Sequence, residues 1–223
     1  HQQLAVSQPE TYLSDFAKSL NILAVQLGEQ GDAKSQQQAL SYAREAMEIY
    51  QQLAASQPAA YLPDLAMSLN TLANQLAEQG DAESRRQALG YARKAMEIYQ
   101  QLAASQPAAY LPDLAMSLNT LANQLAKQGD PESQWQALCY TRNSVEIRQQ
   151  LVSSQPAAYL PGLAASLNNL AIRLAEQSNA ESRRQALDHA REAIQTYRQL
   201  LGSQSAAYLP AFAGSLNNLA IWL

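Results

Sequence analysis

The sequence predicts an all-α protein built as a solenoid of antiparallel helix pairs, and three observations support this. First, 47% of the 223 residues are hydrophobic, mostly alanine and leucine, with only two phenylalanines and eight glycines, a composition that favours helix over strand. Second, apolar residues recur at spacings of three and four, as on one face of a helix. Third, a tyrosine-led phrase recurs every 49 residues, at Tyr12, Tyr61, Tyr110, Tyr159 and Tyr208. A fixed period of this length is typical of a solenoid.

The repeated phrases read YLSDFAKSLN, YLPDLAMSLN twice, YLPGLAASLN and YLPAFAGSLN, and no insertion breaks their register. We therefore expect one solenoid domain over residues 1–223. Its predicted parts are the end of a preceding repeat at 1–9, repeats at 10–58, 59–107, 108–156 and 157–205, and the first helix of a fifth repeat at 206–223. Because the chain begins and ends within a repeat, we expect it to be a fragment of a longer array.

The first helix of each repeat, helix A, is predicted from a leucine stripe. In the second repeat, leucines lie at spacings of 3, 4, 3 and 4, which places them on one helical face: Leu62, Leu65, Leu69, Leu72 and Leu76. Pro63 suits the first turn of this helix, where a missing N–H costs nothing. Gly80 predicts its end, and Asp81 predicts the N-cap of the next helix.

The second helix, helix B, is predicted over residues 82–105. Small and aromatic residues form its stripe at spacings of 4, 3, 4 and 3: Ala88, Ala92, Ala95, Tyr99 and Leu102. A Gln-Pro pair follows and ends the helix, because the residue before proline is pushed out of the helical region. In the next repeat, Asp130 is the expected N-cap and Pro131 the first helical residue. The small alanines allow neighbouring helices to approach closely, and leucines fill the space between them.

These stripes resemble the tetratricopeptide repeat. The signature W-x2-L-G-x2-Y followed by A-x3-F-x2-A is similar to Leu69-x2-Leu72-Ala73-x2-Leu76 followed by Ala88-x3-Ala92-x2-Ala95. The period of 49 is longer than the usual repeat of about 34 residues. The phrase S-L-N-N-L-A looks like the kinesin-light-chain variety and like arrays attached to bacterial signalling proteins. The resemblance implies a right-handed superhelix whose helices A line a concave surface that binds peptides or proteins.

Asparagine recurs one step beyond the central leucine of helix A, and this is the candidate binding site. Asparagine is a mediocre helix former, so its recurrence in mid-helix needs a reason. Residues at helical spacing extend it into a stripe on the predicted concave surface. The predicted peptide-binding residues are Asn21, Met67, Asn70, Asn74, Met116, Asn119, Asn123, Asn168 and Asn217.

Two roles are open for these asparagines, and both can hold. Their amides offer donors and acceptors that could bond the main chain of an extended peptide. Alternatively, they bond neighbouring helices and set the pitch between repeats. The binding role predicts that Asn70, Asn119 and Asn168 are at least partly accessible, and that replacing Asn70 and Asn119 with alanine changes stability little. A clamp for C-terminal carboxylates is disfavoured, because Lys18 is the single base of the stripe.

No residue pattern indicates chemistry, so we expect no enzymatic activity, no metal and no cofactor. His189 replaces a tyrosine of the other repeats, His1 lies at a terminus, and Cys139 replaces Gly90. No P-loop, dinucleotide-binding motif or Cys/His cluster is present. A net charge of -4 without a basic stripe argues against nucleic acid. No apolar stretch predicts a membrane span, and a single cysteine fits a reducing compartment, which we expect to be the cytoplasm.

The leading hypothesis is a scaffold that binds a protein or peptide on its concave helix-A surface. One alternative is a spacer or a self-assembling scaffold whose ends stack, since the last helix A presents Leu209, Phe212 and Leu216 with no helix B after it. Another is the sensor array of a signalling ATPase or protease whose catalytic domain lies elsewhere. Trp135 and Trp222 are single aromatics that we interpret as exposed residues, not binding anchors.

Overall fold

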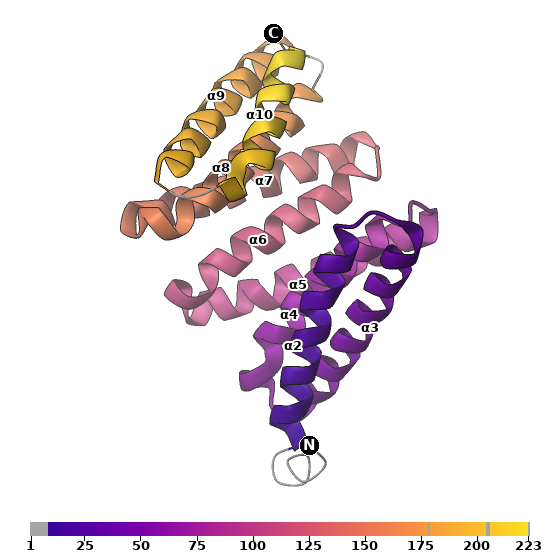
Figure 1. Cartoon of the computed structure of the whole chain (residues 1–223). Coiled ribbons are helices and arrows are strands. Elements are labelled where there is room, and N and C mark those ends of the chain that lie inside the picture. The colour runs from indigo at the N-terminus through magenta and orange to yellow at the C-terminus, as the bar shows by residue number, and fades with distance from the viewer. Residues whose placement is uncertain (1–8, 178, 204–205, 223) are drawn as a thin grey trace. The chain divides into compact units, whose positions relative to one another are not determined.

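The structure, a computed structural model, describes residues 9–177, 179–203 and 206–222, and no strand occurs among them (Figure 1). The predicted all-α class is confirmed. Residues 1–8, which include His1 and most of the predicted tail of a preceding repeat, lie outside the described residues, as does Leu223. The helices are α2 (Pro9–Gly28), α3 (Ala33–Ser56), α4 (Pro58–Ala77), α5 (Ala82–Ser105), α6 (Pro107–Ala126), α7 (Pro131–Ser154), α8 (Pro156–Ala175), α9 (Ala180–Ser203) and, after the 3-10 turn η1 (Ala206–Tyr208), α10 (Leu209–Trp222).

The chain forms two compact units, His1–Pro107 and Ala108–Leu223. In unit 1, α2 packs on α3, α3 on α4 and α4 on α5. In unit 2, α7 packs on α8, α8 on α9 and α9 on α10, and Figure 1 shows α9 and α10 side by side. Helices of 20 and 24 residues thus alternate along the chain and pack consecutively, as a tetratricopeptide-like solenoid requires. The right-handed sense of the superhelix stays a prediction.

Helix A begins earlier than predicted. In α4, Pro58 is the first helical residue after Gln57, and Pro63 lies inside the helix instead of in its first turn. Pro58 fits the start because its fixed φ suits the first helical position and no bond from its nitrogen is needed there. Pro63 cannot donate to the carbonyl of Ala59, but Ala59 is exposed, so water can satisfy that carbonyl.

The turn from helix A to helix B follows the predicted pattern. Gly80 has a φ of +77°, a left-handed conformation that glycine adopts without strain. The carboxylate of Asp81 then accepts a hydrogen bond of 2.9 Å from the backbone N–H of Ser84. Asp130 caps α7 in the same way, with Pro131 in the first turn. The predicted caps are confirmed, because each satisfies a backbone donor that the helix leaves open.

The predicted apolar stripes form the core. Leu72 and Leu76 of α4 are buried, and so is Tyr99 of α5. The alanines of α5, Ala88 and Ala92, are fully buried, which shows that they stand where a neighbouring helix approaches. Small side chains at these positions keep the helices close, and the leucines occupy the remaining volume.

A tyrosine near the end of helix B joins it to helix A of the same repeat. The hydroxyl of Tyr50 donates to the carbonyl of Ser14 at 3.0 Å, and that of Tyr99 donates to the carbonyl of Pro63 at 3.1 Å. Both rings are buried, and burial raises the pKa of Tyr50. In α7 the equivalent position holds Arg148, so one repeat of unit 2 lacks this tyrosine.

The caps predict a specific acid sensitivity. Hydrogen bonds from Ser35, Ser84 and Ser133 lower the pKa of their capping carboxylates, Asp32, Asp81 and Asp130. A carboxylate whose pKa is lower in the folded than in the unfolded state stabilises the protein fully above its unfolded pKa of about 3.9, and this stability is lost as the pH falls through the folded pKa.

Replacing the three aspartates with asparagine should keep the caps and remove their titration, as Asn179 already caps α9 by accepting from Ser182. We expect the melting temperature of the triple variant to fall less than that of the wild type between about pH 6 and pH 2, a range that brackets the unfolded pKa. Thermal unfolding followed by circular dichroism measures this. Parallel pH profiles for the two proteins would contradict the prediction.

Candidate functional site

The recurring asparagines differ in exposure. Asn21 and Asn70 are buried, with 5% and 4% of their surface exposed. Asn119 and Asn168 are half-buried, and Asn217 is exposed. The prediction that Asn70 is partly accessible is therefore wrong, whereas it is confirmed for Asn119 and Asn168. The difference follows from what each helix A packs against.

Hydrogen bonds tie the asparagines to the helix A of the next repeat. In unit 1, Nδ2 of Asn21 in α2 donates to Oγ of Ser68 in α4 at 2.5 Å. In unit 2, Nδ2 of Asn119 in α6 donates to Oγ of Ser166 in α8 at 2.6 Å. We call this pair of groups the Asn–Ser clasp. The amides of Asn21 and Asn119 therefore do link neighbouring helices, and their partners are serine hydroxyls.

In unit 2 the clasp extends to helix B. Oγ of Ser166 lies 3.1 Å from Oγ of Ser144 in α7, and Ser144 donates to the carbonyl of Ala115 in α6 at 2.7 Å. Three helices thus meet at one buried group of hydroxyls. The last step of unit 2 uses a different bond, since Nδ2 of Asn218 in α10 donates to Oδ1 of Asn168 at 3.4 Å.

The phrase Ser-Leu-Asn places the two partners of each clasp. Ser68, Ser117 and Ser166 are fully buried, because each small serine lies where another helix passes closely. Two residues after the serine, Asn21 and Asn119 donate forward to the serine of the next helix A, while the leucine between serine and asparagine is buried. The repeated serine is the signal in the sequence that identifies the clasp.

Other residues of the predicted stripe remain uncovered. Asn74 and Ala165 are exposed, Met116 has 39% of its surface exposed, and Met67, Asn123 and Ile172 are half-buried. We call these six residues the helix-A stripe. Met67 and Asn74 belong to unit 1, and the other four belong to unit 2. The stripe carries a thioether, an amide or a small apolar group at each position and no charge.

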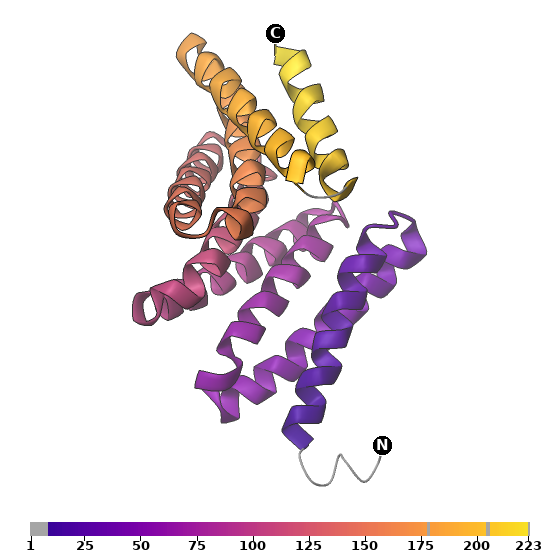
Figure 2. The same cartoon turned by 60° about the vertical axis from the view of Figure 1, so that its left-hand side comes forward.

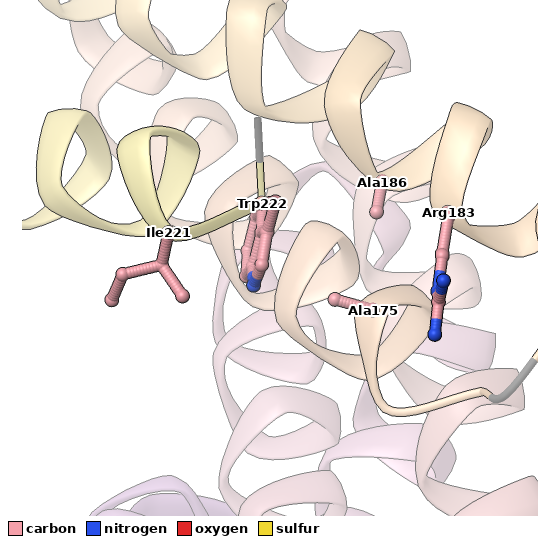
Figure 3. Close-up of a pocket in the computed structure, with 5 residues that line it drawn as sticks. All are labelled: Ala175, Arg183, Ala186, Ile221 and Trp222. Atoms are coloured by element: carbon pink, nitrogen blue, oxygen red, sulfur yellow. The ribbon is translucent and has the colours of Figure 1, made fainter.

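A small cavity lies at the end of unit 2. It has a volume of about 310 Å³ and is lined by Ala175, Arg183, Ala186, Ile221 and Trp222. Figure 3 shows the indole ring of Trp222 and the side chain of Arg183 on opposite sides of the two alanines. The interpretation of Trp222 as a merely exposed residue is wrong, because its ring is half-buried against α8 and α9.

The equivalent position in unit 1 is packed differently. There Gln75 packs directly against Gly28, so that a Cβ at position 28 would lie 2.7 Å from Nε2 of Gln75. At the end of unit 2, the indole of Trp222 and the side chain of Ala175 line the cavity instead. Trp135, by contrast, is 64% exposed, as predicted.

A broader cavity lies between the helices B of unit 1, α3 and α5. It has a volume of about 620 Å³, and the amino group of Lys94 lies 5.9 Å from the centre of the Tyr91 ring beside it. Its rim is charged, with an exposed ion pair of 2.8 Å between Arg86 and Glu83. Exposed pairs of this kind contribute little to stability.

The part of the chain that the structure describes contains no group of three or more His, Cys, Asp or Glu residues placed to hold a metal ion. His189 lies 3.5 Å from the carboxylate of Glu192, and Cys139 is half-buried. Among the described helices, none combines the length and apolar character needed to cross a membrane. The absence of enzymatic activity stays a prediction.

Comparison with known proteins identifies the repeat and the fold. Residues 163–207 match the family profile of a tetratricopeptide repeat. The fold is similar to the crystal structure of BtubC (BKLC) from P. vanneervenii, with a TM-score of 0.59 and 23% sequence identity over 82% of this chain and 63% of that chain. This chain thus spans less than two thirds of that structure, and at this identity the likeness concerns the fold. The curated proteins contain no match to the sequence.

The Asn–Ser clasp predicts that an alanine substitution of its asparagine lowers stability, whereas the binding role predicts little change. Replacing Asn21 with alanine removes a buried hydrogen bond and leaves the hydroxyl of Ser68 without this donor, so we expect a loss of about 1–2 kcal/mol in the free energy of unfolding. Denaturant unfolding measures it, and a double-mutant cycle with Ser68→Ala isolates the coupling.

The matched control is Asn143→Ala, since Asn143 is exposed on α7. A surface change of this kind should stay within about 0.5 kcal/mol. If Asn21→Ala were no more costly than the control, the clasp would not hold the helices A together.

Proposed function

We propose that the chain, which matches a tetratricopeptide repeat over residues 163–207 and has a similar helical fold throughout, binds an extended segment of a protein partner along the helix-A stripe. The match to a tetratricopeptide repeat and the similar fold support a general role as a protein-interaction scaffold. The proposal assigns the contact surface in each unit to helices A and not to helices B. It also keeps the cytoplasm as the expected location, on the ground of the single cysteine.

One observation carries the proposal: the helix-A stripe stays open and uncharged while the neighbouring faces of the same helices are buried. Met116 is 39% exposed, although Leu118 and Leu121 of the same helix are 5% and 0% exposed. A flexible, polarizable methionine adapts to partner side chains of different shape. Asn123, seven residues later on the same helix, offers an amide group that can bond a peptide main chain.

The asparagines divide into two groups under this proposal. Asn21 and Asn70 are buried and serve the spacing of helices A. Asn119 and Asn168 are half-buried, so they could contact a partner as well as a neighbouring helix. Asn217 is exposed in α10 and would extend the contact surface of unit 2.

A matched pair of substitutions in unit 2 tests the surface. Peptides selected from a random library against the whole 223-residue chain would be measured by calorimetry against two variants. We expect Met116→Glu to weaken their binding by about tenfold or more, because it buries a carboxylate under an apolar contact. Trp135→Glu also charges an exposed apolar residue, but on helix B, and should leave binding unchanged.

Equal binding by wild type and Met116→Glu would remove the helix-A stripe from the contact surface. A loss of binding in Trp135→Glu alone would move the contact to helix B.

A second candidate function is self-association, which is favoured by α2. This helix exposes large apolar residues along its length: Tyr12, Leu13, Phe16, Ile22, Leu23 and Val25. In α4 the residues equivalent to Tyr12 and Phe16 are Tyr61 and Leu65, which pack against a core cluster formed by α2 and α3. Figure 2 shows α2, in indigo, at the edge of unit 1. A second copy of the chain is the occupant that we propose for it.

Sedimentation equilibrium tests this second function. The wild type should show an apparent mass that rises with concentration, and a Tyr12→Glu, Phe16→Glu double variant should remain a monomer, because the charges oppose burial of the face. Trp135→Glu serves again as the control that retains association. A wild type that stays monomeric at high concentration would exclude the scaffold that assembles by itself. The sensor-array alternative stays a hypothesis.

A further inference from the structure

One repeat of unit 2 replaces its tyrosine anchor by an arginine. Arg148 stands in α7 where Tyr50, Tyr99 and Tyr197 stand in the other helices B. The tyrosine hydroxyls of unit 1 donate to carbonyls of helix A, whereas among the described residues Arg148 makes no hydrogen bond or ion pair, and its Nε is buried without a partner. Arg148 is half-buried, and a guanidinium nitrogen buried without a partner is unfavourable. The replacement therefore needs an explanation other than packing.

A second replacement lies directly against the first. Position 162 of α8 is a glycine, whereas Asp15, Asp64 and Asp113 occupy it in the preceding repeats. A Cβ at Gly162 would lie only 1.7 Å from Nη1 of Arg148, so the guanidinium rests on the backbone of α8 in space that glycine leaves open. The chain thus introduces a cation and removes, from the facing position, the carboxylate that would neutralise it.

The remaining carboxylate nearby does not take its place. Burial lowers the pKa of Arg148, and the charge of Asp113 in α6 partly offsets this effect. Burial also raises the pKa of Asp113, which Arg148 partly opposes. The two groups influence each other without forming an ion pair within the described residues. The N–H groups of the Arg148 guanidinium therefore remain able to donate to another acceptor.

The position of this arginine relates it to the helix-A stripe. Gly162 lies three residues before Ala165, and Asp113 lies three residues before Met116, so each is one helical turn from a stripe residue on the same face. The guanidinium of Arg148, which rests on Gly162, lies at the N-terminal end of the stripe in unit 2.

We propose that Arg148 binds a carboxylate of the partner, an aspartate or glutamate side chain of the segment that occupies the helix-A stripe. The inference rests on the proposed function of that stripe. A guanidinium offers parallel N–H donors that match the two oxygens of a carboxylate. The partner's carboxylate is the counter-ion that position 162 lacks, since this position is a glycine here and an aspartate in the preceding repeats. The site selects partners by charge at one repeat of an otherwise uncharged stripe.

The anion site is tested without any peptide, on the whole chain. The Nε–H resonance of Arg148, assigned by its loss in Arg148→Tyr, is followed by NMR during titration with sodium acetate at constant ionic strength, with chloride as the reference. We expect a saturable shift with acetate and none with chloride. Arg148→Tyr should fold, since tyrosine is the residue of the other repeats, and circular dichroism checks this.

Gly162→Asp is the matched control, because it restores the carboxylate of the preceding repeats beside the flexible end of Arg148. It should abolish the acetate response. An equal response to acetate and chloride, or an unchanged acetate response in Gly162→Asp, would overturn the inference.

A second measurement separates this inference from the proposed function. In peptides selected against the wild type, one acidic residue is replaced at a time by its amide. We expect one such change to weaken binding to the wild type by about tenfold and to have no effect on binding to Arg148→Tyr. Peptides that need Met116 but no acidic residue would overturn the arginine site and leave the stripe intact. Acetate binding at Arg148 together with peptides that ignore Met116 would overturn the stripe and the link between the two.

Discussion

The hydrogen bond from an asparagine amide of one helix A to a serine of the next is the contact on which the candidate surface depends. It fixes the approach of α2 to α4 in unit 1 and of α6 to α8 in unit 2. The bond favours one particular spacing of neighbouring helices A as well as stabilising them, because the asparagine amide reaches the serine hydroxyl only at that spacing. The amide is incompletely satisfied, since Oδ1 of Asn21 and of Asn119 has no hydrogen-bond partner. This cost indicates that helix spacing, and not maximal stability, explains the recurrence.

Repetition makes the departures from the repeat informative. Where the tyrosine anchor is kept, as in Tyr50 and Tyr99, it donates to a carbonyl of helix A and has a sufficient structural role. Where it is replaced, at Arg148, the new group lacks such a partner and the facing residue has changed with it. Trp222 is a comparable departure, because it lines a cavity, whereas the equivalent Gln75 packs against Gly28 in unit 1. The candidate ligand-binding groups of this protein are therefore the residues that differ from their equivalents in the other repeats.

Local features of the fold could be predicted from particular residues. The helix B limits at Ala82 and Ser105 and the cap at Asp81 were predicted, because proline, glycine and aspartate act on the backbone of their own turn. The predicted start of helix A was wrong. Both Pro58 and Pro63 can lie in the first turn of a helix, and the sequence alone does not distinguish them; in the structure the helix begins at Pro58. Burial of Asn70 was missed for a different reason: it depends on a neighbouring helix and not on its own.

The sequence by itself determined the all-α class, the alternation of helices A and B and the residues that share each helical face, because these follow from periods of 49 and 3.6 residues that need no knowledge of contacts. Only the tertiary structure decided which edge of the helix-A face is covered. One helix places Met116 and Asn119 on adjacent edges of one stripe, and their spacing cannot distinguish them. The serine of the next helix A accepts a hydrogen bond from Asn119, while Met116 remains exposed. Whether a side chain is buried depends on what packs against it, which the sequence of its own helix does not contain.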